Sequence, residues 1–188
     1  MIKRYLLPLA VLSSCTFIDY KQIPALTYRA IKGADDILID QDFINKQEFS
    51  FVKVKIGKQS IAIMTLASID KDTFRWVSAT GEVIVTNNGR IIETAGLPYN
   101  INEVSRVAFQ NNTFETFIFL HNPEAMVMKF SSFKSDPSNN LFYQEEFHVN
   151  KIKWKGTNNY KFNEQGLIAY SKQKIHPKMP DVEMFFYY

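Results

Sequence analysis

The sequence predicts one mostly β, antiparallel domain, either a sandwich or a strongly curved, partly closed barrel. Apolar residues recur at a period of two in short runs over much of residues 49–188. Tight-turn signals such as Asn88-Gly89 separate these runs. The chain also holds 16 Phe and 9 Tyr against only 7 Gly and 7 Pro, and aromatic residues favour strands.

The length and composition are those of one ordinary globular domain. The chain has 188 residues, and its 46% hydrophobic and 22% charged residues exclude a disordered protein. No apolar run approaches the ~20 residues that a membrane-spanning helix needs. Because Cys15 is the only cysteine, an intrachain disulfide and a multi-cysteine metal site are excluded.

The N-terminus has the pattern of a bacterial lipoprotein signal. Two basic residues, Lys3 and Arg4, precede an apolar run over 5–12, and small residues follow it. The segment Leu12-Ser13-Ser14-Cys15 resembles a lipobox, in which the cysteine receives lipid and the preceding peptide is removed. The alternative is a secreted, soluble protein with a free thiol near its start.

This pattern sets the expected organisation of the chain. We predict a lipoprotein signal peptide over 1–14, with cleavage between Ser14 and Cys15. A lipidated tether would follow over 15–22, and residues 23–188 would form one β-rich periplasmic domain. No loop is long or low in complexity, so the sequence shows no further domain boundary.

Acylation would anchor the protein to a membrane. Each buried lipid methylene contributes about 0.8 kcal/mol, so two or three chains such as palmitate hold a protein on a bilayer stably. Thr16 stands where Asp would retain an enteric bacterial lipoprotein, and by resemblance to that sorting rule we expect the outer membrane, facing the periplasm. Loss of Lys3 and Arg4 leaves 20 basic residues against 19 acidic ones, so we expect no nucleic-acid partner.

Two short helices and a series of hairpins are expected in the mature chain. Helical spacing and a following Gly33 predict a helix over 23–32, and a single turn is expected over 40–46. Strands are expected at 49–56, 60–66, 74–78, 82–86, 90–94, 116–120, 125–130, 142–149, 159–163, 166–171 and 182–188, with a polar loop at 134–140.

The sequence shows no recognisable catalytic motif and no cofactor site. His121, His148 and His176 are too far apart in sequence to suggest zinc ligation, and neither a phosphate-binding loop nor a nucleophile elbow occurs. We expect no catalytic residue, no metal and no cofactor.

Three carboxylate pairs are the remaining candidates for hydrolytic chemistry. Asp35-Asp36 and the pair Asp70 and Asp72 lie in turn-like sequence, where Asp commonly bonds its own backbone. Glu145 and Glu146 are neighbours on a predicted strand, so they should point to opposite faces. We therefore rank an enzyme below a binding protein.

Two blocks of sequence resemble the YjbF/GfcB family of outer-membrane lipoproteins. The first block comprises Phe74–Gly81, Ile84–Arg90 and Ile92–Leu97, with Trp-Val-Ser, Asn-Gly-Arg and Thr-x-Gly-Leu as its pattern. The second block has Asn159–Asn163, Gly166–Ile168, Ser171-x-Gln173, Pro177 and Pro180. The chain departs from the family pattern at Asn163, where Asp is usual, and at neighbouring Lys161.

The resemblance implies a lipoprotein of capsule or exopolysaccharide production and export. We expect an accessory or binding protein that holds sugar through aromatic and polar side chains. The alternatives are a structural docking partner of an export or assembly protein and a polysaccharide-modifying enzyme. Within the first block, Trp76 and Arg90 are candidate ligand or partner contacts, although core packing for Trp76 and a salt bridge for Arg90 would also explain them.

Overall fold

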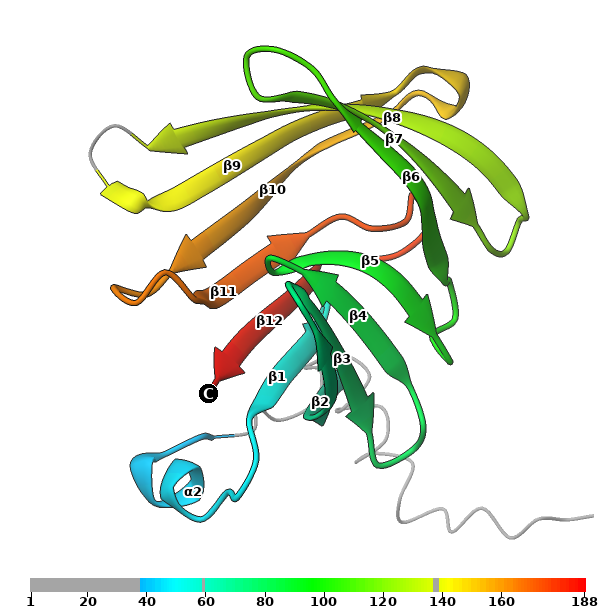
Figure 1. The fold of residues 1–188 in the computed structure, drawn as a ribbon. Helices are drawn as coiled ribbons and strands as arrows, with labels where there is room; N and C mark the ends of the chain where they lie inside the picture. Colours follow the sequence, from blue (N-terminus) through cyan, green and yellow to red (C-terminus); the bar gives the residue numbers. More distant parts are fainter. Residues whose placement is uncertain (1–37, 59, 137–138) are drawn as a thin grey trace, which may run out of the picture. The chain divides into compact units, whose positions relative to one another are not determined.

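The computed structural model describes residues 38–188 except for 59, 137 and 138. The described strands form one antiparallel sheet that closes into a barrel, with neighbours in sequence also neighbours in the sheet (Figure 1). The last strand pairs with the first and so completes the barrel. The barrel alternative of the sequence prediction is therefore confirmed, and its closure is complete rather than partial.

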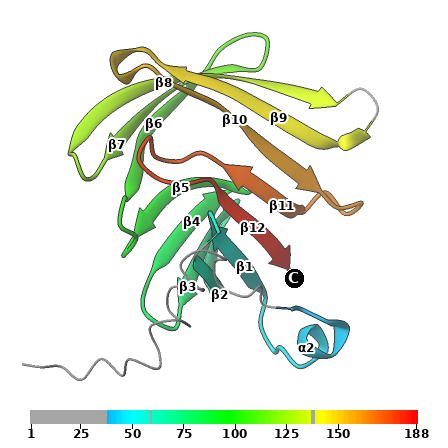
Figure 2. The same cartoon turned by 180° about the vertical axis from the view of Figure 1, so that it is seen from behind.

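Twelve strands lie in the described part of the chain, and Figure 2 shows them from the opposite side. Their bounds are β1 Phe51–Ile56, β2 Ser60–Asp70, β3 Thr73–Ser78, β4 Val83–Asn87, β5 Arg90–Ala95, β6 Ile101–Ala108, β7 Thr113–Leu120, β8 Ala125–Asp136, β9 Asn139–Val149, β10 Trp154–Phe162, β11 Ile168–Gln173 and β12 Val182–Tyr187.

The expected single helical turn before the first strand is confirmed. Helix α2 runs over Gln41–Asn45, and Asp40 caps it by accepting a hydrogen bond from Phe43 N at 2.7 Å. A short 3-10 turn, η2, lies at Asn150–Ile152. The helix expected over 23–32, together with the signal peptide, the tether and Cys15, lies outside the described residues. No helix among the described residues is long and apolar enough to cross a membrane.

Strand β6 was not predicted from the sequence. Of its eight residues only Ile101 is buried, so the strand lacks the alternating apolar pattern that identified its neighbours. Strands β8 and β9 also extend into the region 134–140, which was expected to be a polar loop. Strand β8 continues to Asp136, and β9 begins at Asn139. Backbone pairing along a hairpin does not require apolar side chains, and this explains both differences.

The barrel interior is apolar over one part and polar over another. Trp76 is completely buried in the apolar part, and its indole Nε1 donates a hydrogen bond to Thr86 Oγ1 at 3.0 Å. Barrel closure brings Val52 of β1 beside Phe186 of β12 in this core. Charged and amide side chains are buried in the polar part: Arg90, Lys129, Glu145, Asn158 and Gln173.

Alternate turns of the barrel lie at the same end because each strand runs opposite to the one before it. The β2–β3, β4–β5, β6–β7, β8–β9 and β10–β11 turns therefore share one end. Strand β1 begins at this end and β12 finishes there. The β5–β6 contact is the least extensive in the ladder, with Glu93 opposite Asn102 as its only backbone pair among the described residues.

Candidate functional site

A cavity of about 490 Å³ lies at this end of the barrel, beside the β4–β5, β6–β7 and β10–β11 turns. A space of this size is within the usual range for small-molecule sites. Its lining combines aromatic side chains, two arginines and three asparagines: Asn87, Asn88, Arg90, Arg106, Asn112, Phe114, Phe133, Leu141, Tyr143, Tyr160, Phe162 and Gly166.

Five aromatic side chains form the wall of the cavity. Phe114 meets Phe133 edge to face, with ring centroids 5.4 Å apart, and Tyr143 meets Phe162 in the same way at 5.4 Å. Phe133 also stacks near Tyr160, with centroids 6.1 Å apart. These rings come from β7, β8, β9 and β10, which are consecutive in the sheet. The barrel therefore presents apolar ring surfaces on one side of the cavity.

Arg106 extends over this aromatic wall. Its Cζ lies 3.9 Å from the Phe114 ring centroid and 5.5 Å from that of Phe133, both within cation–π distance. Its buried Nε has no hydrogen-bond partner. Burial and, after it, the positive charge of Arg90 lower the pKa of Arg106. Arg106 is thus a partly desolvated cation that lies near Arg90, and the charges of Glu103 and Glu145 offset part of the effect of Arg90 on its pKa.

A bulge in β6 explains why Arg106 faces the interior. The register with β7 shifts between Glu103 and Ser105. In a regular strand, residues 103 and 106 would point to opposite faces, because their separation is odd. The extra residue lets both Glu103 and Arg106 approach Arg90 across the β5–β6 contact.

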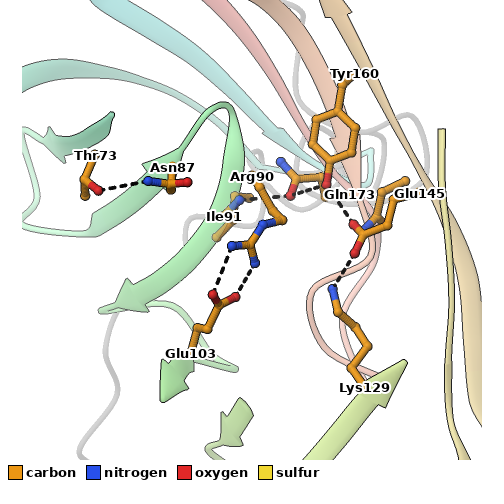
Figure 3. A network of polar contacts seen from close by, with 10 residues as sticks. Thr73, Asn87, Arg90, Ile91, Glu103, Lys129, Glu145, Tyr160 and Gln173 are labelled. Carbon is orange, nitrogen blue, oxygen red and sulfur yellow. Dashed lines mark hydrogen bonds and ion pairs between the residues drawn. The ribbon is translucent and has the colours of Figure 1, made fainter. Parts of the chain in front are cut away.

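Arg90 is held by Glu103 in a two-pronged ion pair (Figure 3). One prong joins Nη2 to Oε1 at 2.9 Å, and the other joins Nη1 to Oε2. Burial alone would lower the pKa of Arg90, but the hydrogen bond and the charge of Glu103 raise it overall. The pair also links β5 to β6, where the backbone ladder is short.

Glu145 lies at the centre of a buried polar network (Figure 3), which reaches the cavity through Tyr160. Its carboxylate accepts from Lys129 Nζ at 3.0 Å, Asn158 Nδ2 at 2.8 Å and the Tyr160 hydroxyl at 2.9 Å. Burial would raise the pKa of Glu145, but the positive charge of Lys129 and the hydrogen bonds from Asn158 and Lys129 lower it to about 2. Burial and the charge of Glu145 raise the pKa of Tyr160. Glu145 is therefore ionised and Tyr160 neutral at pH 7.

Gln173 connects this network to the turn that carries Arg90. Its Oε1 accepts from Ile91 N at 2.9 Å, and its Nε2 donates to Gly89 O at 2.8 Å. The Tyr160 hydroxyl lies 3.3 Å from the same Oε1. The amide thus bonds the backbone on both sides of Arg90 and fixes the point from which its side chain leaves.

A sequence model described as "Group 4 capsule polysaccharide lipoprotein gfcB, YjbF" matches residues 26–126, which is more than half of the chain. The chain belongs to the YjbF family. The region matched by the family includes Arg90, Glu103, Arg106 and Phe114. The other aromatic residues of the cavity come from strands beyond it.

The barrel of this YjbF-family protein is similar to a solved structure. That structure is the crystal structure of the hypothetical lipoprotein YmcC from Escherichia coli (K12). The two chains share 18% identity with a TM-score of 0.64, and the alignment covers 78% of this chain and 87% of YmcC. At this identity the similarity establishes the shared fold. No curated protein matches the sequence.

The two YjbF-type sequence blocks meet in space. Asn88-Gly89 forms the expected turn between β4 and β5, with φ of 48° and 76°. Gln173, from the second block, bonds that turn directly. Asn163 stands where the family pattern has Asp, and its Oδ1 accepts from Gln165 N at 3.0 Å and Leu167 N at 2.9 Å. The same turn contacts need only an acceptor oxygen, so Asn can replace Asp there.

The structure separates the two contact residues expected from the YjbF-type pattern. Arg90 lines the cavity, but both prongs of its guanidinium are engaged by Glu103. Trp76 is 0% exposed and packs in the apolar core, so it offers no surface to a ligand. Cys15 and Ser14 lie outside the described residues.

The candidate carboxylates are also separated. Glu145 is buried and Glu146 is exposed, as their alternation predicted, while Asp70 and Asp72 are exposed at the β2–β3 turn. No group of three metal-ligating side chains occurs among the described residues. Arg106 was not predicted as a site residue, because β6 and its bulge leave no periodic signal in the sequence. The aromatic wall was not predicted either, because its rings come from four different strands.

Proposed function

We propose that this protein is a lipid-anchored, periplasm-facing accessory protein of the outer membrane in capsule or exopolysaccharide production, and that its barrel cavity binds a segment of saccharide. Membership of the capsule polysaccharide lipoprotein family supports the process. The aromatic-walled cavity carries the proposal of binding. Sugar C–H faces pack against aromatic rings, while hydroxyl groups require polar partners nearby.

The polar partners lie at the mouth of the cavity. Asn87 at the end of β4, Asn88 in the β4–β5 turn and Asn112 in the β6–β7 turn add amide groups to its lining. Each amide provides both donors and acceptors, as a sugar hydroxyl does. Rings along one side and amides at the rim form the combination that a saccharide site requires.

The buried carboxylates support a binding role over hydrolysis. A general acid for glycoside cleavage needs a raised pKa and access to the substrate. The pKa of Glu145 is instead lowered, and its oxygens are occupied by Lys129, Asn158 and Tyr160. Glu103 is similarly engaged by Arg90. We therefore propose that the protein acts by binding, without a catalytic step.

Gene deletion followed by complementation tests this function. Deletion should reduce cell-surface or secreted polysaccharide, and the wild-type gene should restore it. Tyr143→Ala, which removes a ring from the cavity wall, should restore less. Tyr170→Ala is the matched control, because Tyr170 contacts Phe185 and does not line the cavity.

The variants must be compared at equal amounts in the membrane fraction and after a check of their melting temperatures. Unchanged polysaccharide after deletion would contradict a role in production. Full complementation by a Tyr143→Ala variant that has lost saccharide binding would contradict the role of the cavity.

A further inference from the structure

We propose that the cavity selects a negatively charged sugar, whose carboxylate or phosphate group binds Arg106. This inference rests on the proposed saccharide site and adds the chemical class of its ligand. Three cations occupy the polar part of the barrel, namely Arg90, Arg106 and Lys129. Glu103 and Glu145 neutralise Arg90 and Lys129, so among the described residues Arg106 remains without a carboxylate partner.

The position of Arg106 suits an anionic ligand. The rings of Phe114 and Phe133 lie within cation–π distance of the guanidinium. These rings do not accept hydrogen bonds from the N–H groups, which point outward in the plane of the guanidinium. Nε is buried and has no hydrogen-bond partner. A planar guanidinium presents donors that match the two oxygens of a carboxylate or phosphate.

The surroundings make an anion favourable at this position. Desolvating a charge without a partner costs free energy, and an opposite charge in the same low-dielectric space offsets that cost. Arg90 adds positive potential beside Arg106, as the lowered pKa of Arg106 reflects after the larger effect of burial. Both arginines line the same cavity, but Glu103 neutralises Arg90, so Arg106 is the cation that would hold a bound anion.

The remaining lining residues favour a sugar as the carrier of this charge. A free inorganic anion would use Arg106 but would leave the aromatic wall without a partner. A uronate or sugar phosphate could place its ring against Tyr143 and Phe162 and its hydroxyls near the rim asparagines. The proposed ligand is therefore an acidic sugar unit.

Saturation-transfer NMR titration of the full-length protein in detergent tests the inference with matched probes. The probes are methyl β-glucoside, methyl β-glucuronide and glucose 1-phosphate. We expect at least one anionic probe to bind about tenfold or more tightly than the glucoside, because charge-assisted hydrogen bonds are about twice as strong as neutral ones. This preference should weaken as salt concentration rises, whereas glucoside binding should not change.

Variants locate the preference at Arg106. Arg106→Gln should reduce the ratio of anionic to neutral affinity towards one, and Arg106→Lys should retain part of it through the remaining charge. Arg75→Gln is the matched control, because Arg75 is exposed on β3 outside the cavity and its loss should leave the ratio unchanged. Melting temperatures establish that each variant is folded.

The outcomes separate this inference from the saccharide site itself. Equal affinities for all three probes would overturn the selection of charge and leave saccharide binding intact. An anionic preference that persists unchanged in folded Arg106→Gln and Arg106→Lys variants would overturn the role of Arg106. Binding of none of the probes would count against both the inference and the proposed saccharide site.

Discussion

Gln173 fixes Arg90 by bonding the backbone on either side of it, accepting from Ile91 N at 2.9 Å and donating to Gly89 O at 2.8 Å. The two residues are 83 positions apart and come from the two separate sequence blocks of the family pattern. The Asn-Gly-Arg and Ser-x-Gln motifs thus form one structural unit. That unit positions Arg90 for Glu103 and sets one side of the cavity.

Replacing Gln173 by Leu should destabilise the barrel. The change preserves approximate size but leaves the Ile91 N–H and Gly89 C=O groups without their buried partners. Each unsatisfied buried group costs about 1–3 kcal/mol, so for the two groups we expect a loss of roughly 2–6 kcal/mol in urea unfolding. Gln144→Leu on the exposed face of β9 should stay within about 0.5 kcal/mol. Equal effects of the two changes would contradict the proposed role of Gln173.

Replacing Gly89 by Val should destabilise the turn for two reasons. Gly89 has a φ of +76°, and a residue with a Cβ atom in this left-handed conformation is less stable by roughly 1–2 kcal/mol. A Cβ at this position would also lie 2.4 Å from Ile168 Cγ1. Gly166→Val shares the positive φ, at +79°, but its Cβ would meet nothing within 4 Å. Thermal denaturation should therefore show a larger drop in melting temperature for Gly89→Val than for Gly166→Val. A smaller drop for Gly89→Val would refute the contact with Ile168.

Neighbouring glutamates should respond very differently to neutralisation. Glu145→Gln removes the charge that pairs with buried Lys129, and breaking such a pair costs about 3–5 kcal/mol. Glu146→Gln removes an exposed pair with Lys134, which contributes about 0–1 kcal/mol. Urea unfolding of the two variants measures the difference, and similar midpoints would argue against a buried pair.

Glu145 should also make stability depend on acidity. Its pKa is about 2 in the folded protein against a usual value of 4.5. Because folding lowers this pKa, the carboxylate stabilises the protein fully above about pH 4.5, and the contribution disappears as the pH falls towards 2. Urea unfolding at several pH values should show this loss. As the pH falls, a Lys129→Met/Glu145→Gln variant should lose less unfolding free energy than the wild-type protein, and the two slopes should differ by up to about 1.4 kcal/mol per pH unit. Identical pH profiles of the two proteins would contradict a lowered pKa at Glu145.

The proposed lipid anchor gives a prediction outside the described residues. Cys15→Ala should abolish labelling by radioactive palmitate and leave unprocessed precursor or unanchored protein, because the thiol proposed to receive the lipid is lost. The variant should also fail to restore polysaccharide in the deletion strain. Labelling that persists in Cys15→Ala would show that lipid is attached elsewhere.

The amino-acid sequence by itself determined the features that depend on near neighbours. Alternating apolar residues predicted most strands, and Asn88-Gly89 predicted the β4–β5 turn, because both signals involve residues within a few positions of each other. Alternation also placed Glu145 and Glu146 on opposite faces. The motifs of the family pattern are local in the same sense, and so is the pattern from which the lipobox at Cys15 is predicted.

Only the tertiary structure decided how the barrel closes and what its cavity contains. Closure depends on β1 meeting β12 across more than a hundred residues, and no local preference specifies that pairing. The β6 bulge turns Arg106 inward, while Trp76 is buried although its sequence context would also suit a surface contact. The partner of Arg90 could not be chosen from sequence, because an arginine binds whichever carboxylate or anion the folded chain brings to it, and here the fold brings Glu103.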